Sequence, residues 1–192
     1  MLEVGCGSGE FALALDAAGY DVTAIDPAAP AGPIFRPIKL EELEDDARFD
    51  AVVAIGVFHH MGESLEPNLD RVARALEGGG SLVLDEFGPD RLDEVTAEWY
   101  EGQRLILAAA GRSTDRPGTE QWAQHHASVT PSDVLLDAVR SRFDERFSED
   151  VPYLWRYLGG VASAELEESL VSMGAITALG FRFVGVPRAG RA

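Results

Sequence analysis

The sequence predicts an α/β fold in which a parallel sheet is covered by helices on both faces. Short, nearly continuous apolar runs alternate with stretches whose apolar residues recur at helical spacing, which is typical of strands buried on both faces. The 192 residues, 46% of them hydrophobic, suit one domain with a sizeable core. No repeat, low-complexity tract or linker divides the sequence, so we expect a single domain over 1–192.

The first strand runs directly into a glycine-rich turn, and residues 1–9 read MLEVGCGSG. A helix should follow from Glu10 to about Ala18, where Gly19 supplies the left-handed residue that often ends a helix. We expect its buried face to carry Phe11, Leu15 and Ala18. A glycine turn at a helix N-terminus lets the backbone approach a ligand closely and favours negative charge there.

The spacing of the glycines separates two cofactor classes. Glycines at positions 5, 7 and 9 give the pattern E-x-G-x-G-x-G, whereas the dinucleotide fingerprint G-x-G-x-x-G needs a glycine at position 10, which is Glu10. The sequence contains no G-x-x-x-x-G-K-S/T, so a P-loop is excluded. An NAD-dependent oxidoreductase is therefore disfavoured, but it stays an alternative.

The second strand, 21–25, ends at the acidic residue Asp26. Three prolines make 27–33 a loop, because proline cannot continue a regular element. A third strand should follow and should end, or lie at an edge, at Pro37, which has no N–H for a sheet ladder. An acidic pair at 41–42 comes next.

The fourth strand, 51–55, lies in the longest apolar run and leads to the pair His59 and His60. A helix that ends at Gly78 should come next, because apolar residues recur there at i, i+3, i+4 and i+7. Its apolar face should carry Leu69, Val72, Ala73 and Leu76. The fifth strand, 81–84, follows the glycine turn.

Beyond position 87 the alternation of strands and helices changes. We expect a helix from Asp90 to about Ala110, with one side formed by Leu92, Val95, Trp99 and Ile106. Another helix should start at Thr130, an N-cap residue followed by proline and an acid. We interpret about 90–140 as a helical insertion over the C-terminal end of the fifth strand. The remaining expected elements are a strand at 142–149, helices at 153–157 and 166–173, and a closing strand at 181–186.

Taken in order, these features resemble the class I S-adenosylmethionine-dependent methyltransferases. The glycine turn resembles motif I, Asp26 matches the acid after the second strand, and 72–84 resembles the family's helix, glycine turn and fifth strand. The resemblance covers residues 1 to about 88. It implies a Rossmann-like, doubly wound, mostly parallel seven-stranded sheet with a helical insertion after strand 5. It also implies S-adenosyl-L-methionine as cofactor and methyl transfer as the reaction.

The resemblance also implies a cofactor site. The turn 5–9 would pass under the methionine part, with Glu3 near its amino group, and the carboxylate of Asp26 would accept hydrogen bonds from both ribose hydroxyls. The adenine would lie near Glu41 or Glu42, of which we prefer Glu41. Asp26 alone would equally suit an NAD ribose. The expected cofactor-binding residues are Glu3, Gly5, Cys6, Gly7, Gly9, Asp26, Pro27, Glu41, Glu42 and Gly56.

Methyl transfer from a sulfonium is an in-line displacement, so positioning does much of the work. A general base is needed when the acceptor must lose its proton early. Histidine titrates near neutral pH, so His59 and His60 are the candidate catalytic residues, with Asp85 and Glu86 expected at the same end of the sheet. The alternative is that one of the two histidines is a buried structural residue.

Two further groups of residues have a chemical and a structural interpretation. Tyr153, Trp155 and Arg156 either line a substrate pocket or pack as a helical face. The histidine pairs 59–60 and 125–126 lack a metal-ligand spacing such as H-x-x-x-H. Because adjacent residues rarely coordinate one ion, we expect no metal site.

Composition limits the acceptor and the compartment. The chain has 33 acidic residues against 16 Lys plus Arg, a formal net charge of −17, and without a basic stripe it is a poor nucleic-acid binder. The D/N-P-P-Y/F tetrapeptide of nucleic-acid methylases is replaced by 55–58, IGVF, so we expect a small-molecule substrate. The longest apolar run is too short for a membrane helix. A single cysteine and no leader fit a cytoplasmic protein.

The start of the sequence departs from the family pattern. Members usually carry one or two helices before the first strand, whereas this sequence begins inside that strand. We expect either a truncated N-terminus or an open cofactor site of low affinity. A protein that binds S-adenosylmethionine without turnover is therefore a second alternative to the enzyme. The sequence predicts neither the methylated atom nor the oligomeric state.

Overall fold

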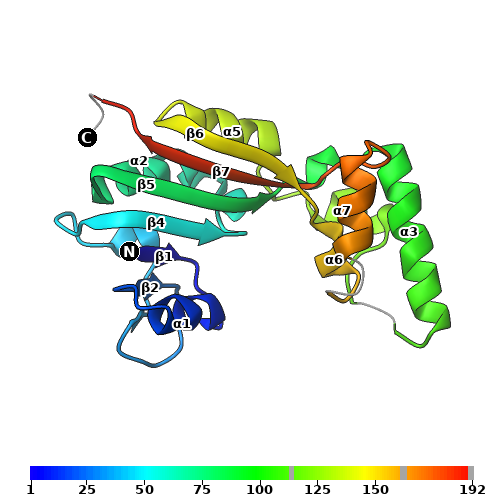
Figure 1. The fold of residues 1–192 in the computed structure, drawn as a ribbon, viewed down its shortest axis with the longest axis horizontal. Coiled ribbons are helices and arrows are strands. Elements are labelled where there is room, and N and C mark those ends of the chain that lie inside the picture. Colours follow the sequence, from blue (N-terminus) through cyan, green and yellow to red (C-terminus); the bar gives the residue numbers. More distant parts are fainter. Residues whose placement is uncertain (113–114, 161–163, 190–192) are drawn as a thin grey trace.

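The computed structural model describes residues 1–112, 115–160 and 164–189 as one seven-stranded sheet with a helical lobe at one end (Figure 1). The strands are β1 (Leu2–Val4), β2 (Thr23–Ile25), β3 (Phe35–Arg36), β4 (Phe49–Ile55), β5 (Leu76–Phe87), β6 (Phe143–Val151) and β7 (Gly180–Pro187). Their order is β3-β2-β1-β4-β5-β7-β6; the first five are parallel, and β7 is antiparallel to both β5 and β6. This confirms the predicted mostly parallel, seven-stranded α/β sheet.

The strand order reverses between β1 and β4. From β1 the sheet continues to β2 and β3 on one side, and to β4 and β5 on the other. In open α/β sheets, such a switch point leaves a crevice outside the carboxyl ends of the strands, and ligands bind there. The turn after β1 and the loop after β4 both lie at this crevice.

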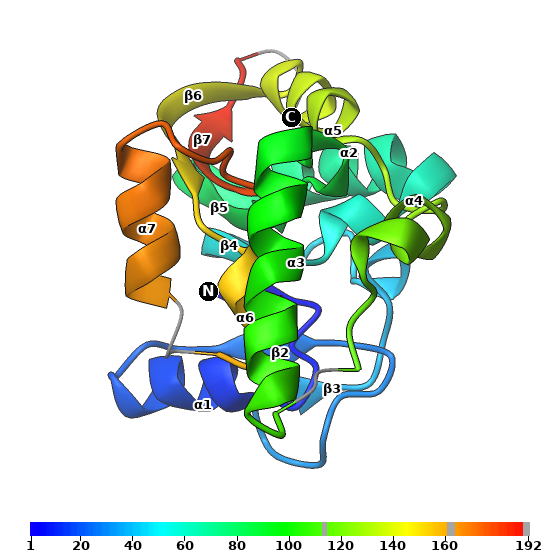
Figure 2. The same cartoon turned by 90° about the vertical axis from the view of Figure 1, so that its right-hand side faces the viewer.

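The helices fall into two groups. Helices α1 (Glu10–Ala17), α2 (Leu65–Ala75) and α5 (Ser132–Arg140) flank the sheet, and α3 (Glu94–Ala109), α4 (Trp122–His125), α6 (Leu154–Tyr157) and α7 (Ala164–Ser172) form the lobe. Figure 2 looks at the lobe end of the molecule, with α7 beside α3. Within the described ranges, no helix is both long and apolar enough to cross a membrane.

The main core lies between the sheet and helices α2 and α5. The predicted apolar face of α2 is confirmed, because Leu69, Val72 and Ala73 are all buried in this core. Helix α2 ends at Ala75 and not at Gly78 as expected. The difference arises because Leu76 already has an extended backbone, with ψ 134°, and begins β5.

Helix α1 buries a different side from the one expected. Ala12 is fully buried against Val22 and Ala24, whereas Phe11 is 39% exposed and Ala18 is also exposed. The prediction for Phe11 and Ala18 is wrong because the helix turns Ala12, and neither of these two residues, toward the strands. Leu15 is half-buried against the same cluster.

The lobe is built from two separate segments of the chain, about 88–131 after β5 and about 152–179 between β6 and β7. They share an apolar core formed by Phe87, Tyr100, Trp122, Leu154, Tyr157, Leu158 and Leu179. Helix α5 falls inside the expected insertion at 90–140, but it packs in the main core through Leu135, Leu136 and Val139. The cover over the strand ends is thus completed by residues from the second segment.

Helix α3 also differs from its predicted orientation. Val95 and Ile106, expected on its buried side, are 59% and 63% exposed. Thr96 and Tyr100 are buried instead. These two residues are four apart and lie on one face of the helix, and that face meets the lobe core. The prediction is therefore wrong for Val95 and Ile106, whereas Leu92 and Trp99 are partly buried against the lobe core as expected.

Candidate functional site

The glycine turn after β1 adopts backbone conformations that favour glycine. Gly5, Gly7 and Gly9 have φ values of 74°, 51° and 82°. A Cβ at Gly5 would overlap the Cγ2 methyl of Val57, and one at Gly9 would lie 2.5 Å from Cζ of Phe35. Nothing lies within 4 Å of the corresponding position at Gly7, so this side of the turn is open to a ligand.

The turn is fastened to the end of β2. The amides of Gly5 and Cys6 donate to the carbonyl oxygen of Ile25 at 2.8 and 3.2 Å. Asp26 accepts one bond at each carboxylate oxygen, from the amide of Gly7 at 3.2 Å and from that of Ala28 at 2.7 Å. An ionised carboxylate offers about four acceptor positions, so Asp26 can anchor the turn and still accept from hydroxyl groups.

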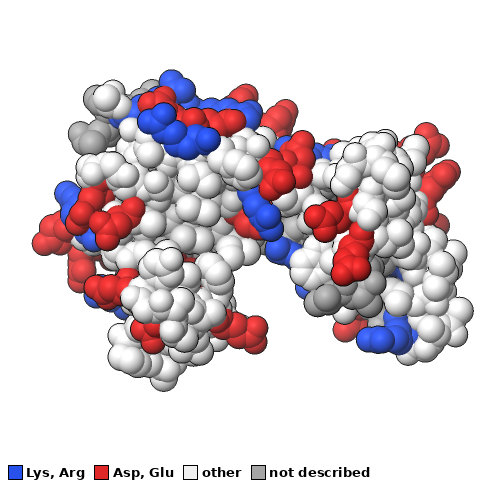
Figure 3. All heavy atoms as spheres, in the orientation of Figure 1, with Lys and Arg blue, Asp and Glu red and all other residues white. Residues whose placement is uncertain are grey.

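A cavity of about 320 Å³ opens beside this turn, at the switch point of the sheet. It is lined by Val4, Gly5, Ile25, Asp26, Pro27, Ile38, Lys39, Leu40, Glu41, Val57, His60, Met61, Ser64 and Asn68. Predicted residues from four separate stretches of sequence therefore meet at one cavity. The space-filling view shows the molecule hollowed between the sheet and the lobe (Figure 3).

The two glutamates of the acidic pair have different tasks. The carboxylate of Glu42 accepts from the amide of Lys39 at 2.8 Å and caps the short turn 40–42. Glu41 lines the cavity, and its Oε1 accepts from Nδ2 of Asn68 at 2.9 Å. That hydrogen bond is the largest cause that lowers the pKa of Glu41.

Asn68 is a site residue that the sequence reasoning missed. It is 2% exposed, and its Nδ2 also approaches Sδ of Met61 at 3.3 Å. The signal was a polar residue on an apolar helical face, because position 68 lies between the buried Leu65 and Leu69 of α2. Such a buried amide needs partners, and here it orients the carboxylate at the cavity.

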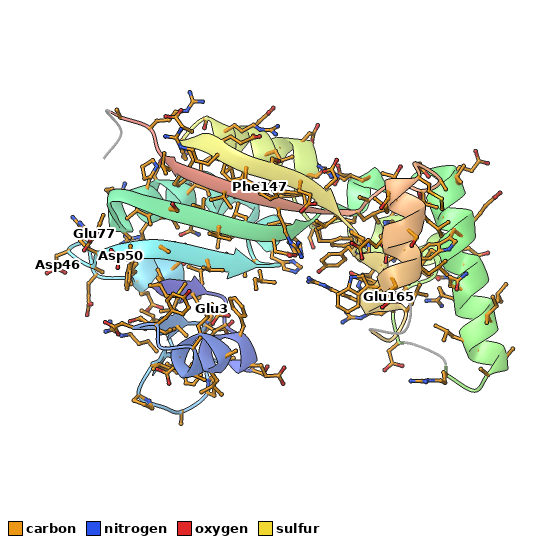
Figure 4. All side chains as sticks on the ribbon, viewed as in Figure 1. Glu3, Asp46, Asp50, Glu77, Phe147 and Glu165 are labelled. Carbon is orange, nitrogen blue, oxygen red and sulfur yellow. The ribbon has the colours of Figure 1, made fainter. Side chains whose placement is uncertain are left out.

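Glu3 and Cys6 are both buried next to the glycine turn. Glu3, on β1 (Figure 4), is 4% exposed, and burial raises its pKa. Its Oε2 is buried without a hydrogen-bond partner among the described residues, so it would be satisfied by a donor such as an ammonium group. Burial, with the charges of Glu3 and Asp26, raises the pKa of the Cys6 thiol to about 11, so this cysteine is an unreactive part of the turn.

Of the two histidines after β4, His59 is buried and His60 is exposed. His59 is 3% exposed, and its Nδ1 lies 2.6 Å from Oε2 of Glu86, which is fully buried. His60 is exposed and lines the cavity. Partial desolvation by the surrounding protein, together with the neighbouring His59, lowers the pKa of His60. The two rings are 4.0 Å apart.

Tyr153 approaches the histidine pair from the lobe. Its ring stacks on Phe87 at 4.3 Å, and the guanidinium of Arg156 lies over it at 4.6 Å. A Cβ placed on Gly56 would lie 3.8 Å from both Cε1 of His59 and the hydroxyl oxygen of Tyr153. The tyrosine hydroxyl and the imidazole therefore both lie close to Gly56.

Trp155 and Arg156 face a different space. Both line a second cavity of about 280 Å³, together with Glu149 and Arg182. Arg156 and Arg182 each contact a carboxylate oxygen of Asp85, at 3.3 and 3.0 Å. The structure thus brings Tyr153 to the histidines, while Trp155 lies on the other cavity.

The lobe adds one histidine whose position the sequence did not predict. The ring of His126 lies 5.4 Å from Phe87, its Nδ1 is 2.9 Å from the carbonyl of Trp122 and its Nε2 is 3.2 Å from the hydroxyl of Tyr157. Burial lowers its pKa. Over the residues that the structure describes, no three His, Cys, Asp or Glu side chains are grouped closely enough to hold a metal ion.

In sequence, the chain matches one protein-family model and two curated proteins. The model of a family described as "Methyltransferase domain" matches residues 1–127. A ubiquinone biosynthesis O-methyltransferase of Rickettsia akari (strain Hartford) is 32% identical in an alignment of 96 residues that covers 43% of this chain and 38% of that protein. A protein of the same name from Bradyrhizobium sp. (strain ORS 278) is 28% identical in an alignment of 153 residues that covers 71% of this chain and 56% of that one. The chain thus spans about half the length of these curated relatives.

Solved structures share the fold. An S-adenosylmethionine-dependent methyltransferase from Mesorhizobium loti superposes with a TM-score of 0.60, covering 97% of this chain and 90% of that one. The two sequences are 18% identical. At this identity the likeness concerns the fold, which agrees with the sheet order and with the cavity at its switch point.

Proposed function

The chain belongs to the class I S-adenosylmethionine-dependent methyltransferases, and from this premise we propose that it transfers a methyl group from S-adenosylmethionine to a small-molecule acceptor. The cofactor carries its methyl group on a sulfonium sulfur. When the methyl group is transferred, the rest of the cofactor leaves as a neutral thioether. The protein must therefore bind and orient two molecules in line. The cavity between the glycine turn, Asp26 and Glu41 carries the proposal.

The residues around this cavity fit the parts of the cofactor. The open glycine turn, with Cys6 packed inside it, would pass under the methionine part, and the unpartnered oxygen of Glu3 would accept from its ammonium group. Asp26 would bind the ribose hydroxyls, beside Pro27. Glu41, held by Asn68, would face the adenine. Glu42 caps a turn, so its contribution would be indirect.

Two observations support a small-molecule acceptor. The curated relatives are named as methyltransferases of ubiquinone biosynthesis, which indicates a small organic substrate. The formal net charge of −17 would repel the phosphates of a nucleic acid. The acceptor would enter between the sheet and the lobe and meet His59, His60 and Tyr153 above Gly56.

Calorimetric titration of the protein with S-adenosylhomocysteine, with NADH in parallel, tests the cofactor class. We expect S-adenosylhomocysteine to bind and NADH not to bind. Binding of NADH alone, or of neither compound, would contradict the proposal. Transfer of a labelled methyl group to a panel of small molecules then separates an enzyme from a protein that binds the cofactor without turnover.

A further inference from the structure

The buried pair of His59 and Glu86 supports an inference that rests on the proposed function and extends it to the acceptor. We infer that Glu86 is a positioning residue that holds the proton of His59 on Nδ1, so that Nε2 is the base that takes the proton of a hydroxyl acceptor. The acceptor class would be a phenol or an enol.

The first argument is the hydrogen bonding of Glu86. Its carboxylate is 0% exposed, and Oε1 accepts from the amides of Val57 at 3.1 Å and Phe58 at 2.7 Å. Its Oε2 lies 2.6 Å from Nδ1 of His59. An ionised carboxylate only accepts hydrogen bonds, so Nδ1 must donate. The lone pair of the neutral ring is then on Nε2.

The second argument is the position of Nε2. The ring is held by its bond to Glu86, by an edge contact with Phe87 at 5.9 Å, and by its own carbonyl, which accepts from the amide of Thr130 at 2.8 Å. Nε2 has no hydrogen bond within the described part of the chain, and it is not one of the fully buried side-chain atoms that lack a partner. Nε2 is therefore not fully buried, and Cε1 of the same ring lies 3.8 Å from a Cβ placed on Gly56, as does the hydroxyl oxygen of Tyr153.

The chemistry of the acceptor follows from this base. A neutral hydroxyl is a weak nucleophile and must lose its proton as its oxygen bonds to the methyl carbon. The O–C bond forms while the S–C bond breaks, and the O–H proton passes to Nε2. The imidazolium that results is stabilised by the carboxylate of Glu86 and returns the proton to water. A neutral amine is a stronger nucleophile than a neutral hydroxyl and can lose its proton after the N–C bond has formed, so it does not require such a base.

The two amides that bind Glu86 make one substitution diagnostic. In Glu86→Gln, the amides of Val57 and Phe58 still need an acceptor, so the side-chain carbonyl should turn toward them. The NH₂ group then faces Nδ1 of His59, which must become an acceptor. The ring proton moves to Nε2, and the base is lost with little change in side-chain volume.

The experiment is ¹⁵N NMR of the full chain with labelled histidine, at a pH where the rings are neutral, with the His59 signals assigned from their loss in His59→Asn. We expect His59 to carry its proton on Nδ1 in the wild type and on Nε2 in Glu86→Gln. Glu167→Gln is the matched control, because Glu167 is also fully buried and accepts from backbone amides at 153–155. It should leave the His59 tautomer unchanged. A wild-type proton on Nε2 would overturn the inference, and this wild-type measurement does not depend on the folding of Glu86→Gln.

Activity gives the second readout. With phenolic acceptors, Glu86→Gln should lower kcat by roughly 10²–10⁴-fold, remove the acidic limb of the pH profile of kcat, and leave the Kd of S-adenosylhomocysteine unchanged. Methylation of amines but not of hydroxyls would contradict the acceptor class. If the wild type failed to bind S-adenosylhomocysteine, the proposed function would fail, whereas the tautomer result would stand or fall independently.

Discussion

Asn68 donates from Nδ2 to Oε1 of Glu41 at 2.9 Å, and this bond joins helix α2 to the short turn that follows β3. Asn68 is 2% exposed and Glu41 is on the surface of the cavity. A buried amide thus fixes the orientation of a carboxylate that would otherwise rotate freely in solvent. If Glu41 faces the adenine as proposed, the affinity for the cofactor should depend on this pair as a unit.

A double-mutant cycle on the pair tests this dependence. Asn68→Ala and Glu41→Ala should each weaken binding of S-adenosylhomocysteine. The double variant should lose less affinity than the sum of the two losses, because either change alone already removes the oriented carboxylate. Isothermal titration calorimetry measures the three losses. Glu42→Ala serves as the matched control, since Glu42 bonds the amide of Lys39, and its effect should add to that of Asn68→Ala. Additivity between Asn68 and Glu41 would refute the coupling.

Asp26→Ala should weaken binding of S-adenosylhomocysteine by about 1.5–3 kcal/mol, which is the usual contribution of hydrogen bonds to a charged group. Asp26 also accepts from the amides of Gly7 and Ala28, so the thermal midpoint must be measured alongside the affinity. Asp26→Asn, which keeps an acceptor for these amides, should retain more stability while still losing affinity. Unchanged affinity in both variants would remove Asp26 from the ribose site.

The sequence predicted the order of the elements and the glycine turn because both depend on local patterns. Gly5, Asp26 and the acidic pair are found by reading along the chain, and the sheet topology brings them to one cavity. The choice between Glu41 and Glu42 required the structure, because both are exposed acids in one short turn. Only the partner of each, Asn68 or the Lys39 amide, separates their roles.

The sequence predicted His59 and Glu86 at the same end of the sheet, but it did not predict that these two side chains pair. The two residues are 27 positions apart, and they meet because parallel strands β4 and β5 place Ile55 opposite Asp85. The helices expected at 153–157 and 166–173 are found as α6 and α7, but the sequence did not predict that this second segment joins the lobe formed after β5. Both features depend on contacts between elements, which composition and spacing do not encode.

Two glycine substitutions separate the effect of a steric clash in the turn after β1 from the effect of backbone strain. Gly5→Ala and Gly19→Ala both place a side chain at positive φ, which costs about 1–2 kcal/mol. At Gly19 nothing lies within 4 Å, whereas at Gly5 the new methyl would overlap Val57. Denaturant unfolding should therefore show a larger loss for Gly5→Ala, by about 1–3 kcal/mol for the overpacking. Adding Val57→Ala should recover part of it; equal losses at the two glycines would rule out the close contact.

Glu3→Gln should weaken cofactor binding and increase the stability of the folded protein. Burial raises the pKa of Glu3 above its ordinary value of 4.5, so the folded protein prefers the protonated carboxyl. This contribution to stability is complete below pH 4.5 and is lost as pH rises through the raised folded-state pKa. Glutamine remains neutral and escapes that loss, so the variant should gain free energy of unfolding over the wild type as pH rises from 4.5 toward 7.

Urea titrations of both proteins at several pH values measure this difference. The glutamine cannot offer the charged oxygen that is now buried without a partner among the described residues, so S-adenosylhomocysteine should bind more weakly to Glu3→Gln at pH 7. A variant that loses stability and affinity together would show that Glu3 is a structural residue. A gain in stability with a loss of affinity is the expected result, because Oε2 of Glu3 has no partner among the described residues and the proposed ammonium group of the ligand would supply one.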